Sequence, residues 1–193
     1  MRLREVERGE NFGKRLLIGL ISRMSGIRLP DAARVAFYRT EFFGGPLGAW
    51  TQAALRGPSE WSIGERELMA AHVAMWNSCT FCTGAHSAVA AKFLGRSVVD
   101  RAMDGKTDEL SPGLQATLTF LERLTLSPKE VTGTDAQSVL QAGVTRAALE
   151  DAIAVASIFD IVTRYADALD FQVPTEPEFD IAADMLLKRG YKA

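Results

Sequence analysis

Two cysteines and a histidine lie within eight residues of one another near the middle of the sequence. Cys79 and Cys82 are the only cysteines of the chain, and His86 follows the second by four residues. Residues three and four apart share a face of a helix, so on a helix Cys82 would neighbour both Cys79 and His86. Two adjacent thiols can reduce an oxidised substrate by forming a disulfide, while an imidazole manages the protons. The spacing therefore indicates dithiol redox chemistry.

The identity of the attacking sulfur stays open on spacing alone. Asn77 and Ser78 are N-cap residue types, so we expect a helix that starts there and places Cys79 in its first turn. Backbone N–H groups and the helix dipole at that end favour a thiolate at Cys79. His86, one turn beyond Cys82, could instead take the proton of Cys82.

Two alternatives compete with redox chemistry at this pair. Buried cysteines often serve as small apolar residues, so the two could simply pack among the neighbouring alanines. A zinc site is the second alternative, with His72 as a fourth ligand to Cys79, Cys82 and His86. However, His72 would come from the preceding helix among apolar neighbours, where a core histidine bonded to a backbone carbonyl is the more common arrangement.

Glu67 is the remaining candidate for the site. It lies at the edge of a run of 24 residues, 68–91, that contains no charged side chain. The carboxylate could be a solvated residue near a helix start, favoured by the dipole, or it could face the thiols and hold a proton for them. Spacing does not separate these two interpretations.

Helix signals dominate the chain, and alternating strand patterns do not occur. The uncharged run is long enough to span a bilayer, but its polar and cap residues favour two consecutive buried helices. We predict an all-α single domain, residues 1–193. The helices are expected at residues 5–24, 30–43, 47–55, 62–76, 78–95, 97–103, 111–126, 134–141, 145–169 and 176–190.

Composition excludes several classes of protein. The chain has 193 residues, of which 47% are apolar and 24% charged, with a formal net charge of −2. Nucleic acid and anionic membranes are therefore not indicated as partners. The apolar run near the N-terminus is too short for a signal peptide, and two cysteines make no disulfide framework. We expect a cytoplasmic protein.

The segment from Glu67 to His86 resembles the core of the alkylhydroperoxidase D-like (AhpD-like) proteins of the carboxymuconolactone decarboxylase superfamily. The shared pattern is a glutamate, eleven residues, C-x-x-C, three residues and a histidine. The similarity covers residues 46–173, so that residues 1–45 are interpreted as an N-terminal helical extension and 174–193 as a C-terminal helix. The resemblance implies an AhpD-like helix bundle that assembles as a homo-oligomer, a trimer or hexamer.

The resemblance also implies roles for the four residues. Cys82 would attack the peroxide, Cys79 would resolve the product as a disulfide, and Glu67 and His86 would move protons. The sequence departs from the characterised peroxidases at Phe81, where they carry a second histidine, so a shorter proton relay is expected.

The predicted function is a thiol-dependent peroxidase or dithiol oxidoreductase with catalytic residues Cys82, Cys79, His86 and Glu67. No organic cofactor and no metal are implied. The expected partners are a small hydroperoxide and a thiol or disulfide reductant protein. The alternatives are a non-redox enzyme like the carboxymuconolactone decarboxylases, or a helical oligomeric scaffold with an inert or zinc-binding C-x-x-C.

Overall fold

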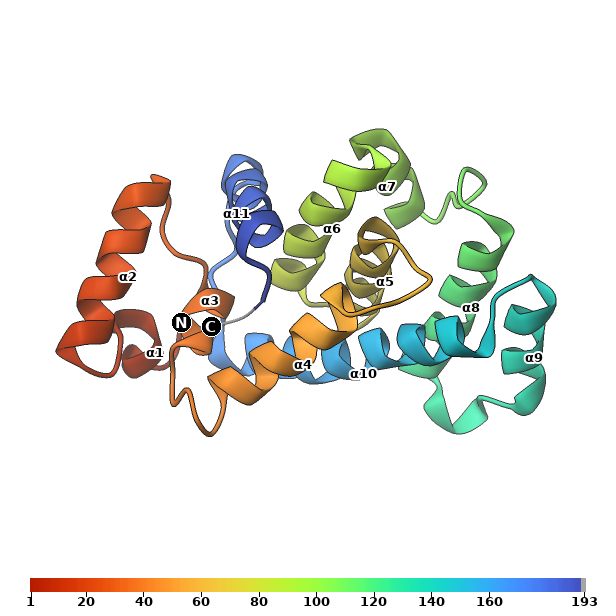
Figure 1. Ribbon diagram of the computed structural model, residues 1–193, viewed down its shortest axis with the longest axis horizontal. Helices are drawn as coiled ribbons and strands as arrows, with labels where there is room; N and C mark the ends of the chain where they lie inside the picture. Colours follow the sequence, from red (N-terminus) through yellow and green to blue (C-terminus); the bar gives the residue numbers. More distant parts are fainter. Residues whose placement is uncertain (192–193) are drawn as a thin grey trace.

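A computed structural model describes residues 1–191, which form eleven α-helices and one short 3-10 helix (Figure 1). The predicted all-α class is confirmed. The helices are α1 (Arg4–Arg8), α2 (Phe12–Ser25), α3 (Asp31–Ala36), α4 (Gly44–Arg56), α5 (Ile63–Trp76), α6 (Thr80–Leu94), α7 (Arg96–Met103), α8 (Pro112–Leu126), α9 (Gly133–Gln141), α10 (Arg146–Leu169) and α11 (Glu176–Arg189), with the 3-10 helix η1 (Pro128–Glu130) between α8 and α9.

The first predicted helix, residues 5–24, is wrong in one respect, because it is broken into α1 and α2. Gly9 separates them at a φ of 91°, a left-handed value that favours glycine. A Cβ at this position would lie 2.9 Å from the backbone nitrogen of Arg15. Asn11 then caps α2 by accepting a hydrogen bond from the Lys14 amide at 2.9 Å.

The second predicted helix, residues 30–43, is also too long. Only α3 is helical, and the chain then passes through turns in which Arg39 has a φ of 40°. Helical periodicity in the sequence could not reveal this left-handed residue, because its side chain carries no turn signature.

The centre of the molecule is the pair α5 and α6, which carries the uncharged run. Leu68, Met69, Val73 and the neighbouring residues of α5 are fully buried, and α4, α8 and α10 pack around this helix. The prediction of two consecutive buried helices is confirmed. Within residues 1–191, no helix is long and apolar enough to cross a membrane.

The last helix, α11, lies against α6 (Figure 1). The two approach closely at Gly84, where a Cβ would lie 2.5 Å from the ring of Phe179. This packing brings the C-terminal turn after α11 back to α4, where the backbone amide of Tyr191 donates to Gln52 Oε1 at 2.8 Å. The Tyr191 side chain thereby reaches Glu67, which is fully buried.

Candidate functional site

The turn between α5 and α6 positions the two thiols. Ser78 has a φ of 61°, which reverses the chain, and the Cys79 amide then donates to the Ala74 carbonyl at 2.9 Å. Cys79 itself is the N-cap residue of α6, one position later than the cap expected from the sequence. Asn77 holds the turn against α10 through a hydrogen bond from Nδ2 to Asp160 Oδ1 at 2.9 Å.

Both thiols are reduced and buried, with exposed fractions of 1% for Cys79 and 2% for Cys82. Hydrogen bonding from the Cys82 thiol lowers the pKa of Cys79, burial acts in the opposite direction, and the Cys82 backbone amide lowers it further. The pKa of Cys82 is raised by the same thiol interaction and by burial. The negative charge of the pair is therefore favoured at Cys79, where the α6 amides point.

Two side chains of α10 border the thiols. The Asp167 carboxylate raises the pKa values of both cysteines by its negative charge. Burial raises the pKa of Tyr165, and the two thiols raise it further. A neutral phenol thus lies beside the pair, together with one acidic group.

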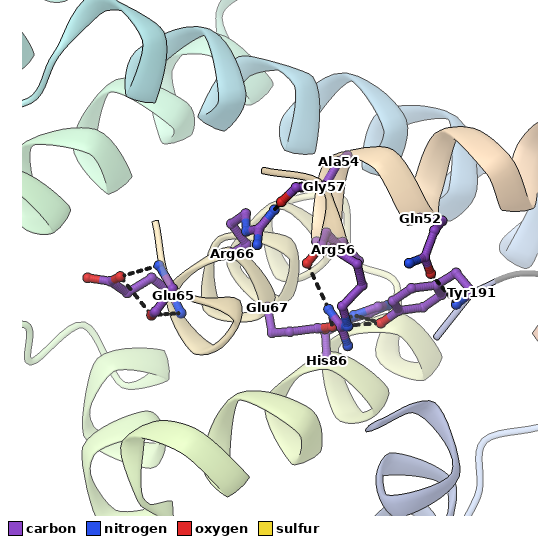
Figure 2. A network of polar contacts seen from close by, with 11 residues as sticks. Gln52, Ala54, Arg56, Gly57, Glu65, Arg66, Glu67, His86 and Tyr191 are labelled. Atoms are coloured by element: carbon purple, nitrogen blue, oxygen red, sulfur yellow. Dashed lines mark hydrogen bonds and ion pairs between the residues drawn. The ribbon is translucent and has the colours of Figure 1, made fainter. Parts of the chain in front are cut away.

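Glu67 is completely buried on α5, with an exposed fraction of 0%. The helix starts at a capping box in which Ser62 and Glu65 satisfy each other's backbone amides, and this fixes the face on which Glu67 lies. Its Oε2 meets His86 Nδ1 at 2.6 Å, across the interface between α5 and α6 (Figure 2). The interpretation of Glu67 as a solvated residue is therefore wrong.

Two residues absent from the sequence prediction complete this cluster. Arg56, at the end of α4, places Nη1 2.6 Å from Glu67 Oε1, and the Tyr191 hydroxyl donates to the same oxygen at 2.8 Å (Figure 2). The Tyr191 ring lies nearly parallel to the His86 ring. The Arg56 guanidinium lies over the Tyr191 ring, 5.0 Å from the centroid of that ring. Three side chains from three other segments thus enclose the Glu67 carboxylate.

These contacts decide the charge of Glu67. Burial acts to raise the pKa of the carboxyl, but the charge and hydrogen bond of His86, the charge of Arg56 and the Tyr191 hydroxyl together lower it. The carboxylate is therefore ionised, and it holds a proton on His86 Nδ1. In the neutral tautomer that carries its proton on Nδ1, His86 has its acceptor at Nε2, and this atom can exchange a proton with other groups.

The structure thus contains two clusters to which α6 contributes, the thiol pair and the Glu67–His86 cluster. Cys82 and His86 are one turn apart on α6, which is the spacing of side chains on a common face. Within the described chain, no hydrogen bond joins His86 to either sulfur. Phe81, which occupies the position between the cysteines, packs edge-on against Phe171 with ring centroids 5.1 Å apart.

His72 is a core histidine, as predicted. Its Nδ1 lies 2.9 Å from the Leu68 carbonyl and its Nε2 lies 3.2 Å from the Ala102 carbonyl. Both ring nitrogens are thus directed at backbone oxygens rather than at the thiols. Across residues 1–191, no three histidine, cysteine or acidic side chains are grouped so that they could hold a metal ion.

Sequence patterns gave no means of finding Arg56, Tyr191 or Asp167. Arg56 and Tyr191 are 11 and 124 residues from Glu67, and neither belongs to a recognisable motif. Asp167 lies on the last turn of α10, where an acidic residue opposes the helix dipole and is a weak sign of another role.

Comparisons with known proteins give matches only among solved structures. No protein-family model matches the chain, and no curated protein matches it. An uncharacterised peroxidase-related protein from Silicibacter sp. TM1040 superposes with a TM-score of 0.75 at 19% identity, covering 88% of each chain. An uncharacterised peroxidase-related protein from Ralstonia eutropha JMP134, with an alkylhydroperoxidase AhpD core, gives 0.72 at 20% identity over 90% of each chain.

The chain has the AhpD-like fold. The debrominase Bmp8 shares it, with a TM-score of 0.70 at 15% identity over 91% of this chain and 94% of the enzyme. The AhpD-like fold therefore occurs in proteins described by different activities, and the function of this chain has to be argued from its own site.

Proposed function

We propose that this protein is a dithiol oxidoreductase that reduces small hydroperoxides through Cys79 and Cys82. The observation that supports the proposal most is the placement of two reduced thiols at the start of α6, where one of them, Cys79, has a lowered pKa. Such a pair forms a disulfide after small adjustments of one helical turn.

The reaction consists of two balanced steps. One thiolate attacks the terminal peroxide oxygen, the O–O bond breaks, and the products are a sulfenic acid and an alkoxide that takes up a proton. The second thiol then attacks the sulfenic sulfur, which forms the Cys79–Cys82 disulfide and releases water. An external dithiol supplies two electrons and two protons and restores both thiols.

The Glu67–His86 cluster supplies the proton management. An ionised Glu67 keeps the proton of His86 on Nδ1 at 2.6 Å, so Nε2 is the acceptor on the face that α6 shares with Cys82. We propose that His86 accepts the proton of a reacting thiol and returns it to the leaving oxygen, with water as the intermediary.

Steady-state turnover tests the proposal. Hydrogen peroxide and tert-butyl hydroperoxide are offered with a panel of dithiol reductants, and wild type is compared with Cys82→Ser and His86→Ala. We expect saturable turnover by wild type that Cys82→Ser abolishes. Thiols that stay reduced in the folded protein, with no turnover under any reductant, would instead support an inert helical scaffold.

A non-redox decarboxylase activity is the alternative enzyme function. It would not consume thiols, so it predicts that Cys82→Ser retains activity on a lactone substrate while the wild-type thiols survive peroxide. Thiol consumption therefore separates the two enzyme classes in a single assay.

A further inference from the structure

A row of large apolar side chains on α2 faces solvent. Phe12, Leu16, Leu20 and Met24 follow one another at four-residue intervals, which places them on one face of the helix. Their exposed fractions are 81%, 65%, 52% and 74%. We call this row the α2 stripe. Single exposed apolar residues are ordinary on a protein surface, but a continuous row along a whole helix is typical of a surface that another molecule covers.

The opposite face of α2 is the one that contacts the rest of the chain. Residues two positions apart lie on opposite sides of a helix, so Lys14, Ile18 and Ser22 form a second row behind the stripe. Lys14 Nζ donates to the Phe37 carbonyl. Ser22 Oγ accepts from the Leu29 amide at 3.1 Å, and within Phe12–Ser25 Ile18 alone is buried. A helix that packs only on its own chain turns its apolar face inward, so α2 has the polarity of a helix that binds a second molecule.

The α2 stripe is complementary to itself. The helix forms one end of the long axis of the molecule, where a second copy can approach it (Figure 1). Antiparallel pairing about a two-fold axis places Phe12 of each copy opposite Met24 of the other and Leu16 opposite Leu20. In this register the four side chains are covered along the whole row, which is about 18 Å long.

Arg23 gives the pairing a charge complement. It lies three residues after Leu20, so its guanidinium belongs to the stripe and not to the polar row. In the antiparallel register Arg23 lies opposite Gly13 of the other copy, which has no side chain to obstruct it. The carboxylate of Glu10 is then roughly 5 Å further along the same helix axis, within reach of a long arginine side chain.

The same charges disfavour a membrane as the occupant. A helix that binds an anionic membrane carries free basic side chains on the polar side of its apolar face. Lys14 of α2 instead pairs with Glu10, and Arg15 Nε donates to the Gly9 carbonyl at 3.2 Å. Arg23, inside the apolar row, would have to enter the hydrocarbon, which is costly for a guanidinium.

We propose that the α2 stripe binds the α2 stripe of a second copy of this chain, antiparallel and about a two-fold axis. The family resemblance implied a trimer or hexamer without assigning a surface to any contact. Two-fold pairing at α2 produces a dimer of single chains, or joins two trimers into a hexamer. This inference does not depend on the proposed dithiol function.

The mass of the assembly in solution tests the surface. Leu16→Glu combined with Leu20→Glu places four carboxylates in one helix pair, so light scattering should show half the wild-type mass. The matched control is Leu126→Glu, at the end of α8, where the side chain is 56% exposed; this variant should keep the wild-type mass. Circular dichroism confirms that both variants are helical. A monomeric wild type, an undiminished mass in the double variant, or an equal loss in Leu126→Glu would overturn the proposal.

Arg23 variants test the charge complement. Arg23→Glu brings a carboxylate toward Glu10 of the other copy, so the dissociation constant of the pair should rise at least about tenfold. Arg23→Lys keeps the charge and should stay within about threefold of wild type. Sedimentation equilibrium measures both values. An Arg23→Glu protein that associates as tightly as wild type would overturn the antiparallel register.

Disulfide trapping tests the orientation without a destabilising charge. Leu16→Cys and Leu20→Cys are made separately in a chain that also carries Cys79→Ser and Cys82→Ser. Antiparallel pairing brings residue 16 of one copy beside residue 20 of the other, whereas two copies of the same residue are about 6 Å apart along the axis. An oxidised mixture should therefore hold at least about fivefold more mixed than like-with-like disulfide. An excess of the like-with-like product would indicate parallel helices and overturn the proposal.

Vesicles test the competing occupant. Sedimentation with phosphatidylserine and phosphatidylcholine vesicles should leave wild type in the supernatant, together with the variant that combines Leu16→Glu and Leu20→Glu. Wild-type binding that the double variant loses would assign the stripe to a membrane surface and overturn the proposal.

Discussion

The two clusters to which α6 contributes are built in opposite ways. The Glu67–His86 cluster is saturated with polar contacts: Glu67 receives Arg56, Tyr191 and His86 within 2.8 Å. Fewer polar groups act on the thiol pair: the two thiols act on each other, and the Cys82 amide, the Asp167 carboxylate and the Tyr165 phenol lie beside them. A saturated buried cluster is rigid and fixes charge, whereas a pair of weakly bonded sulfurs is free to change partners. The first is therefore suited to holding protons and the second to exchanging bonds.

Removing one member of each cluster should produce the largest effect and the sharpest contrast. Cys82→Ser should reduce hydroperoxide turnover by at least about 1,000-fold, because no disulfide can form. His86→Ala should reduce it by about 100-fold, since the thiols remain and only proton transfer is lost. Steady-state turnover with a dithiol reductant measures both. Equal losses would mean that the two clusters do not have separate roles.

Glu67→Gln tests whether the saturated cluster supports the fold. The substitution leaves the Arg56 guanidinium buried without its carboxylate, and such a loss costs about 3–5 kcal/mol of unfolding free energy. Urea unfolding followed by circular dichroism measures it. The matched control is Glu65→Gln in the exposed capping box, where glutamine retains the motif and the change should be below about 1 kcal/mol. Similar values for both variants would contradict the role assigned to Glu67.

Tyr191→Phe removes one hydrogen bond from the cluster and leaves the ring. A hydrogen bond to a charged group contributes about 1.5–3 kcal/mol, so this loss should be smaller than that of Glu67→Gln. The pKa of Glu67 should rise, because one of the contacts that lower it is gone. Urea unfolding and the acid limb of the turnover profile report these two effects. If the variant has the unfolding free energy of wild type and the same acid limb in its turnover profile, the Tyr191 hydroxyl neither stabilises the fold nor lowers the pKa of Glu67.

Acidification should weaken the fold in two stages of different origin. Burial lowers the pKa of His72 in the folded state, so the unfolded chain binds its proton first. Stability therefore falls as the pH drops below about 6.5, by at most about 1.4 kcal/mol per pH unit. The pKa of Glu67 is also lowered, so its contribution is present above about pH 4.3 and is lost as the pH falls further.

Urea midpoints between pH 8 and about pH 2 measure the two stages. His72→Asn should flatten the upper stage and leave the lower one, whereas Tyr191→Phe should move the lower stage toward higher pH. If His72→Asn loses as much stability below about pH 6.5 as wild type does, His72 is not the source of the upper stage.

The sequence was sufficient for what depends on local spacing. The helices α5, α6, α8 and α10, the placement of Cys79 at a helix start and the neutral core position of His72 all follow from periodicity, caps and neighbours within a few residues. The breaks at Gly9 and Arg39 were not found, because a left-handed backbone leaves little trace in the side-chain pattern.

The contacts that complete the site depend on tertiary packing. Tyr191 reaches Glu67 only because Gly84 allows α11 to lie directly on α6 and Gln52 holds the C-terminal turn. Asp167 reaches Cys79 only because α10 passes beside the start of α6. No spacing rule links residues so far apart in the chain, so the thiols could be predicted but the groups that set their charge could not.

The most direct test of the account is the fate of the two thiols when the folded protein meets one equivalent of hydrogen peroxide. Alkylation followed by mass spectrometry of the peptide that holds Cys79 and Cys82 measures it, with urea-unfolded protein as the reference. The account predicts that both thiols disappear together into one intramolecular disulfide, faster than in the unfolded chain, and that a dithiol restores them. Thiols that stay alkylatable in the folded protein, or a single cysteine oxidised to sulfinic acid while the other survives, would contradict it.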